Sequence, residues 1–213
     1  MNKYIDLRNN LDLEELKEPA KIIKDGGIVI FPTETVYGIG TNGFNEESVR
    51  KIYELKKRDF NKPISLLVSN MEMVKTVAEN ITNLERALME QFWPGPFTII
   101  LKKKKIVPDI LTANGETVGV RMPSGIIAKQ LIEYAGVPIA TPSANISGNP
   151  SGTNIDDIRN DFEGKVDCII DSGISELGVA STIVKVIDGI PHVLREGTIT
   201  KKQIQEVVSK VIK

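Results

Sequence analysis

Cationic and hydroxyl-bearing residues, with few carboxylates among them, gather in the polar segments that follow the apolar runs of this chain. Lys56, Arg58 and Lys62 lie at the end of a predicted helix, and Arg121 ends a predicted strand. Arginine binds phosphate or carboxylate oxygens in a forked geometry, whereas lysine acts as a point charge. The cluster around Arg58 either complements the dipole of its helix or forms an anion site. Together with Arg121, it is typical of a site for a polyanionic substrate.

Hydroxyl groups are concentrated in two loops. The segment 31–43, FPTETVYGIGTNG, follows an apolar run and cannot be a helix, and the segment 142–153, PSANISGNPSGT, is too polar to pack a core. Loops of this length in a compact domain are often functional, and threonine or serine hydroxyls can both donate and accept hydrogen bonds. We therefore expect two binding loops, joined by Ser181 and Arg195 near a predicted hairpin.

Several common site classes do not fit. Gly38, Gly40 and Gly43 spell G-x-G-x-x-G, but residues 32–37 separate them from the preceding strand, and no acidic residue follows about 20 positions later. The chain has no Walker A sequence and no G-x-S-x-G elbow. One cysteine, Cys168, and one histidine, His192, exclude an internal disulfide and the usual zinc site. The chemistry would rest on positioning and charge neutralisation, as in nucleotidyl transfer, and the residues alone indicate a protein that binds a phosphorylated small molecule or RNA.

Apolar runs and helical patterns alternate along the chain, which predicts an α/β fold with an open mixed β-sheet flanked by helices in one domain, 1–213. Asp12 begins a helix that Pro19 splits or restarts, and Thr153 with Asp156 opens a short one. The other expected elements are helices at 46–57, 71–78, 83–92, 125–134 and 200–213, strands at 28–31, 64–68, 97–101, 118–121, 137–141 and 166–170, and a hairpin of 182–187 with 192–195.

The composition of the chain limits which binding partners and which cellular compartment are expected. The 213 residues are 41% hydrophobic and 26% charged with a net charge of -1, so the whole chain has no electrostatic drive toward nucleic acid or membrane. No apolar run of membrane-spanning length and no signal-peptide pattern occurs. We expect a cytoplasmic protein without a membrane partner.

Nearly the whole chain resembles the YrdC-like family of L-threonylcarbamoyladenylate synthases, in its short, single-domain form. The resemblance rests on ordered segments: FPTETVYGIG, KKRDFNKPI, FWPGPFTIIL, VGVRMP, TPSANISGNPSGT, STIV and VLREG. It implies a twisted mixed sheet with a large basic cavity, and a nucleotidyltransferase that condenses L-threonine, bicarbonate and ATP into threonylcarbamoyladenylate and diphosphate. The product would serve N6-threonylcarbamoyladenosine formation at position 37 of tRNA, through downstream threonylcarbamoyltransferase proteins and at most weak tRNA contact. ATP is then a substrate, accompanied by Mg2+ without a predicted protein ligand.

The resemblance also implies roles for single residues. Lys56 and Arg58 would be catalytic, and we expect alanine at either position to abolish turnover and leave the fold intact, because both are predicted to lie in a surface cluster. Two positions depart from the family pattern: Leu67 stands where some relatives have His, and Lys62 where many have Asn. L-Threonine would contact Thr35, Arg121, Thr141 and Ser181, and ATP would contact Arg58, Lys62, Thr117, Ser143, Asn145, Ser151 and Arg195.

Two alternatives stay open from the sequence. The same basic cavity could make the chain an RNA-binding module, although 5% aromatic residues supply few stacking platforms. Related domains of larger hydrogenase-maturation proteins carry out carbamoyl adenylation, but the zinc-finger and acylphosphatase-like segments that accompany them do not occur in this sequence.

Overall fold

The computed structural model describes residues 3–211, and its elements alternate along the chain much as predicted. The helices are α1 (Lys17–Lys24), α2 (Glu46–Leu55), α3 (Met71–Val77), α4 (Asn83–Phe92), α5 (Ile126–Ala135), α6 (Arg159–Phe162) and α7 (Lys201–Val211), with 3-10 turns η1 (Leu13–Leu16) and η2 (Asp109–Thr112). The strands are β1 (Lys3–Asp6), β2 (Val29–Phe31), β3 (Gly38–Asn42), β4 (Leu66–Leu67), β5 (Ala78–Glu79), β6 (Phe97–Lys103), β7 (Thr117–Arg121), β8 (Ile139–Ala140), β9 (Cys168–Asp171), β10 (Thr182–Ile187) and β11 (Ile190–Arg195).

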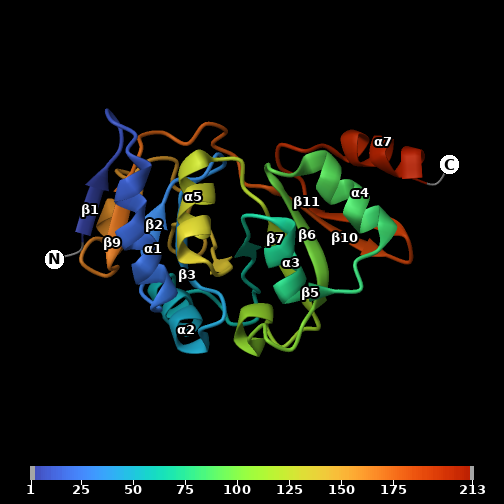
Figure 1. Ribbon diagram of the computed structural model, residues 1–213, viewed down its shortest axis with the longest axis horizontal. Helices are drawn as coiled ribbons and strands as arrows, with labels where there is room; N and C mark the ends of the chain where they lie inside the picture. The colour runs from blue at the N-terminus through green and yellow to red at the C-terminus, as the bar shows by residue number, and fades with distance from the viewer. Residues whose placement is uncertain (1–2, 212–213) are drawn as a thin grey trace.

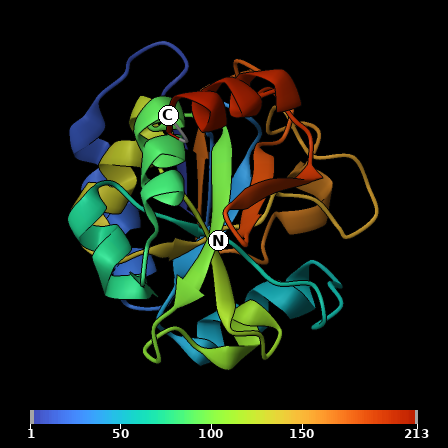
Figure 2. The same ribbon diagram turned by 90° about the vertical axis from the view of Figure 1, so that its right-hand side faces the viewer.

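All strands belong to one mixed sheet that runs through the molecule in the order β1-β9-β2-β3-β8-β4-β7-β6-β10-β11, with β5 paired to β6. Figure 1 shows the two ends of this sheet on opposite sides of the view, with α1 and α5 in front of the strands at one end. At the other end α7 lies beside α4, as Figure 2 shows from the side. The predicted open mixed sheet flanked by helices is confirmed.

Local signals placed the starts of α2 and α4 correctly. Asn45 caps α2 by accepting a hydrogen bond from the Ser48 amide at 3.0 Å, and Thr82 and Glu85 form a capping box at the start of α4. The 3-10 turn η1 precedes α1, so the chain does change helix type just before Pro19. These signals act within three or four residues, which is why the sequence reveals them.

The structure corrects the segment 31–43, which is not entirely a loop. Its second half forms β3, antiparallel to β2 and β8. A Cβ at Gly38 would lie 2.5 Å from Cγ2 of Thr141, and one at Gly40 would lie 2.7 Å from the ring of Phe31. Glycine is required there because neighbouring protein side chains come close.

Other differences between the predicted and the observed elements concern their length and number. The strands predicted at 64–68 and 137–141 shorten to two-residue β4 and β8, and β1 and β5 were not predicted. The predicted helix after Thr153 is replaced by turns in which Asp157 accepts hydrogen bonds from the Thr153 amide and hydroxyl, and only α6 follows. Asp157 thus supplies the backbone with an alternative to a helical turn. Within residues 3–211, no helix is long and apolar enough to cross a membrane.

Candidate active site

One row of paired residues crosses five adjacent strands in the middle of the sheet and forms the floor of a cavity. Leu67 of β4 pairs with Arg121 of β7, which pairs with Thr98 of β6; Thr98 pairs with Ile183 of β10, which pairs with Arg195 of β11. All five line a cavity that is open to solvent and has an empty volume of about 690 Å³. Sheet register therefore brings together residues that lie up to 128 positions apart in the sequence.

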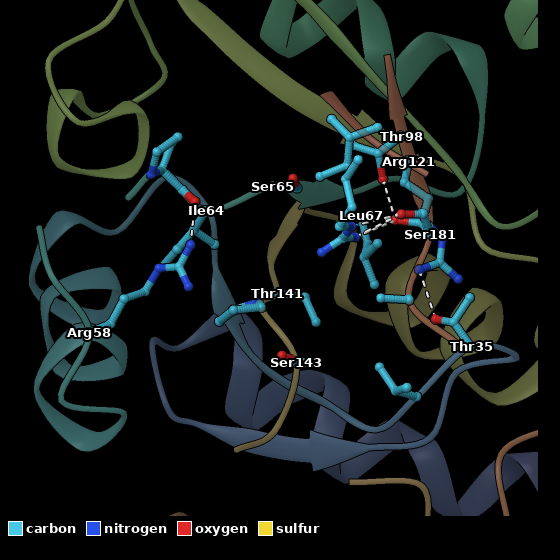
Figure 3. A pocket seen from close by; sticks show the side chains of 16 residues that line it. Thr35, Arg58, Ile64, Ser65, Leu67, Thr98, Arg121, Thr141, Ser143 and Ser181 are labelled. Atoms are coloured by element: carbon cyan, nitrogen blue, oxygen red, sulfur yellow. Dashed lines mark hydrogen bonds between the residues drawn. The ribbon is translucent and has the colours of Figure 1, made fainter. Parts of the chain in front are cut away.

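The walls of the cavity come from loops that the sequence analysis singled out. Gly38 forms an isolated bridge with Ser143, and the Ala144 amide donates to the Tyr37 carbonyl at 2.7 Å, so the two predicted binding loops lie side by side. Figure 3 shows Arg58 on one side of the cavity and Arg121 with Thr35 on the other. The remaining lining residues are Val36, Pro63, Ile64, Ser65, Thr141, Pro142, Ala180 and Ser181.

Three protein groups hold the guanidinium of Arg121 in place. Its Nε donates to the Gly95 carbonyl at 3.2 Å, its Nη1 donates to Thr35 Oγ1 at 2.9 Å, and its Nη2 lies 2.7 Å from Glu34 Oε1 in a buried ion pair. Burial alone would raise the pKa of Glu34, but the charge and hydrogen bonding of Arg121 bring it below its ordinary value. Because a guanidinium has five N–H groups, Arg121 keeps donors for a ligand in the cavity.

Arg58 and Arg195 are anchored differently, by backbone carbonyls. Arg58 donates to the carbonyls of Lys62 and Pro63 at 2.9 and 2.8 Å, and Arg195 donates twice to the Ser181 carbonyl at 3.0 and 2.8 Å. In the described part of the chain neither forms an ion pair with a carboxylate. Burial lowers the pKa of both, and the charges of Arg121 and Arg58 lower that of Arg195 further. Two positive charges without a protein counter-ion favour an anion between them.

Lys56 is not part of a surface cluster, and that prediction is wrong. The residue is 1% exposed and does not line the cavity. Its Nζ donates to the Ser143 carbonyl at 2.6 Å and to the Asn145 carbonyl, with Asn145 Oδ1 at 3.4 Å. Lys56 thus supports the loop that carries Ser143, and its replacement is expected to affect the fold as well as turnover.

The burial of Lys56 predicts a pH-dependent stability. Burial, followed by the charge of Arg58, lowers the pKa of Lys56 from 10.5 to about 7. Between these values the unfolded chain binds more protons than the folded one, so the free energy of unfolding should rise with pH, by at most about 1.4 kcal/mol per pH unit from this group. Urea unfolding from pH 7 to 10 should show this rise in the wild type and in the exposed-site control Lys57→Met, but not in Lys56→Met. Parallel curves for all three proteins would contradict it.

Seven of the residues that the resemblance implied lie on this cavity, contributed by six separate segments of the chain. Three carry the guanidinium groups described above, and four carry hydroxyls. Thr35 is 1% exposed and Ser181 is 5% exposed, and the Ser181 hydroxyl pairs with that of Thr98 at 2.8 Å. The seven are Thr35, Arg58, Arg121, Thr141, Ser143, Ser181 and Arg195.

The other implied residues lie outside the cavity. Lys62 has an exposed side chain, and its carbonyl holds Arg58. Asn145 is buried, and its Oδ1 accepts a hydrogen bond of 2.5 Å from the Ser143 hydroxyl. Ser151 lines a separate cavity together with Asp157 and Asp161. Thr117 is on the same face of β7 as Arg121, about 13 Å away along the strand.

One cavity residue, Thr98, and one residue that contacts Arg121, Glu34, were not predicted to act at the site. Thr98 lies in the apolar segment FTIIL and is 2% exposed, and Glu34 lies behind Arg121. A hydroxyl inside an otherwise apolar strand and a single acid inside a hydroxyl-rich loop are the signals that could have found them. Leu67, the departure noted above, is 3% exposed and gives the cavity floor an apolar patch next to Arg121.

A protein-held metal does not fit this cavity. Within residues 3–211, no group of three or more histidine, cysteine, aspartate or glutamate side chains is arranged to bind an ion. Glu34, the acid nearest the cavity, is already paired with Arg121.

Known proteins share this fold and much of this sequence. The Sua5/YciO/YrdC family model, described as telomere recombination, matches residues 21–197. The chain is 39% identical to a threonylcarbamoyl-AMP synthase of Pyrococcus abyssi, covering 99% of this chain and 62% of that protein. A putative threonylcarbamoyl-AMP synthase of Methanocaldococcus jannaschii is 40% identical, with 93% and 94% covered. The crystal structure of P. abyssi Sua5 complexed with L-threonine matches with a TM-score of 0.92 at 40% identity, covering 96% of this chain and 60% of that one.

These relatives bear on both function and length. The chain spans about three fifths of the length of the P. abyssi protein. The names of the relatives favour the synthase prediction over the RNA-binding alternative.

Proposed function

Since this chain belongs to the Sua5/YciO/YrdC family, we propose that it joins L-threonine, bicarbonate and ATP into threonylcarbamoyladenylate, with release of diphosphate. The threonine amine takes up CO2 from bicarbonate and becomes a carbamate. A carbamate oxygen then attacks the α-phosphorus of ATP while the bond to the leaving diphosphate breaks. No nucleophile from the protein takes part.

The observation that carries this proposal is the division of charge in the cavity. Arg121 has a buried counter-ion, Glu34, whereas Arg58 and Arg195 have no carboxylate partner within residues 3–211. Both donate to backbone carbonyls, and Arg195 also donates to the Ser181 hydroxyl at 3.2 Å. Arg58 and Arg195 therefore favour a polyphosphate, and Arg121 favours a single carboxylate. A zwitterionic amino acid and a nucleoside triphosphate are the pair of ligands that this division fits best.

Each set of side chains then has a role. Arg121 binds the threonine carboxylate, supported by Thr35, and the hydroxyls of Thr141 and Ser181 contact the rest of the amino acid. Arg58, Arg195 and Ser143 bind the triphosphate and offset the charge that grows on the leaving diphosphate. The apolar floor at Leu67 is suited to the threonine methyl group.

The implied residues outside the cavity receive supporting roles in this proposal. Lys56 and Asn145 hold the loop of Ser143, and the Lys62 carbonyl orients Arg58. Thr117 and Ser151 can contact the nucleotide only where it extends beyond the cavity. A Mg2+ ion would arrive bound to the phosphates of ATP, as part of the substrate, and no step described here depends on it.

The experiment that tests the proposal follows the product directly. Purified protein is incubated with ATP, L-threonine and labelled bicarbonate, and the labelled adenylate and diphosphate are separated and quantified. We expect both to form only when threonine and bicarbonate are present together. Diphosphate release that is independent of either one would contradict the proposal.

The chemistry of the proposed product also indicates which class of protein would consume it. Threonylcarbamoyladenylate is a mixed anhydride, so an acyl-transfer protein that modifies tRNA is the expected consumer, and we place this transfer in the cytoplasm. The chain itself would need only weak contact with tRNA, consistent with its net charge of -1.

A further inference from the structure

Glu34 connects the cavity to the start of helix α5. Its side chain is 3% exposed, and one carboxylate oxygen, Oε1, lies 2.7 Å from Nη2 of Arg121. The other oxygen accepts a hydrogen bond of 3.4 Å from the amide of Gly125, the N-cap residue of α5, and α5 has no side-chain cap of its own. The Glu34 carbonyl accepts from the Leu177 amide at 2.8 Å, so the backbone is fixed as well.

These contacts make Glu34 a rigid anchor. A carboxylate near the positive end of a helix is stabilised there by the helix dipole. An arginine side chain, in contrast, has several rotatable bonds and loses much rotamer freedom when it is fixed. The Gly95 carbonyl and the Thr35 hydroxyl hold Nε and Nη1 of Arg121, and Glu34 holds Nη2, the remaining terminal nitrogen.

We propose that Glu34 is a positioning residue, which holds the Arg121 guanidinium so that its free edge faces the cavity and binds the carboxylate of the amino-acid substrate. This inference rests on the proposed function and adds a residue to it. Glu34 acts through Arg121 and does not line the cavity itself. Because it fixes only the amino-acid side, its effect is confined to threonine and does not extend to ATP.

The test compares three substitutions of Glu34 in steady-state kinetics. Alanine removes the anchor, and we expect the KM for threonine to rise about 10- to 100-fold, with the KM for ATP changed less than about threefold. Glutamine keeps an oxygen at the same reach and should restore the threonine KM to within about threefold of the wild type. Aspartate keeps the charge but withdraws the carboxylate by one methylene, so it should behave like alanine.

Folding is checked for each variant by thermal unfolding, with Glu133→Ala on the exposed face of α5 as a matched control. If Glu34→Ala does not fold, the comparison of glutamine with aspartate decides. A normal threonine KM in Glu34→Asp together with a raised one in Glu34→Gln would show that charge matters and position does not, and would overturn the proposal. A threonine KM unchanged in all variants, or raised equally with that for ATP, would overturn it as well.

A direct titration separates this inference from the function on which it rests. Wild-type protein is titrated with L-threonine by calorimetry, without ATP. A wild type that neither binds threonine nor forms the adenylate would overturn the proposed function and this inference with it. A wild type that does both, beside Glu34 variants with wild-type affinity for threonine, would overturn this inference alone.

Discussion

Replacing Arg58 with alanine is expected to lower kcat/KM for ATP by about 10²- to 10³-fold, with little change in thermal stability. Arg58 is partly exposed, lines the cavity and, within residues 3–211, donates only to the carbonyls of Lys62 and Pro63. Its removal therefore takes a charge from the phosphate side without leaving a buried ion unpaired. Turnover would be measured by diphosphate release at varied ATP and saturating threonine.

Two further variants make the Arg58 result specific. Arg58→Lys keeps the charge but cannot form the fork, so its activity should lie between those of alanine and the wild type. Arg86→Ala, an exposed arginine of α4 outside the cavity, should leave kcat/KM unchanged. An Arg58→Ala protein with near-normal kcat/KM would remove Arg58 from the proposed mechanism.

The contrast between Arg58 and Lys56 shows what the sequence could and could not predict. Both belong to one run of cations after a helix, and of this run Arg58 lines the cavity whereas Lys56 does not. Which of the two is exposed depends on Ser143 and Asn145, which lie 87 and 89 residues later and bring carbonyls to Lys56. A local pattern carries no information about such a partner.

Which residues pair across adjacent strands could not be predicted from the sequence, for the same reason. The hairpin of 182–187 with 192–195 was predicted because its turn spans only a few residues. The pairing of Thr98 with Arg121 and Ile183 follows only from strand order, in which β6 lies between β7 and β10. Thr98 therefore looked like one more residue of an apolar strand.

Breaking the Arg121–Glu34 ion pair is the second substitution for which we expect a large effect. Arg121→Met should lower the free energy of unfolding by about 3–5 kcal/mol, because it leaves the Glu34 carboxylate buried without its counter-ion. It should also lower threonine-dependent turnover by about 10²- to 10³-fold, since the carboxylate of the amino acid loses its charged partner. Chemical denaturation and adenylate formation measure the two losses separately.

The pH dependence of this loss has a definite sign. In the wild type the pKa of Glu34 is below its ordinary value, so the pair contributes stability at neutral pH and loses it as the pH falls through that lowered pKa. In Arg121→Met, burial without the cation should raise the pKa of Glu34, and protonation then removes the unpaired charge. The stability difference between the two proteins should therefore be largest near pH 7 and shrink toward pH 4.

A double variant separates the stability effect from the binding effect. Glu34→Gln combined with Arg121→Met contains neither buried charge, and replacing both partners of an ion pair costs less than breaking it. We expect the double variant to recover most of the stability that Arg121→Met loses and none of the threonine-dependent turnover. If threonine use recovered together with stability, Arg121 would contribute to the fold alone, and another group would have to bind the substrate carboxylate.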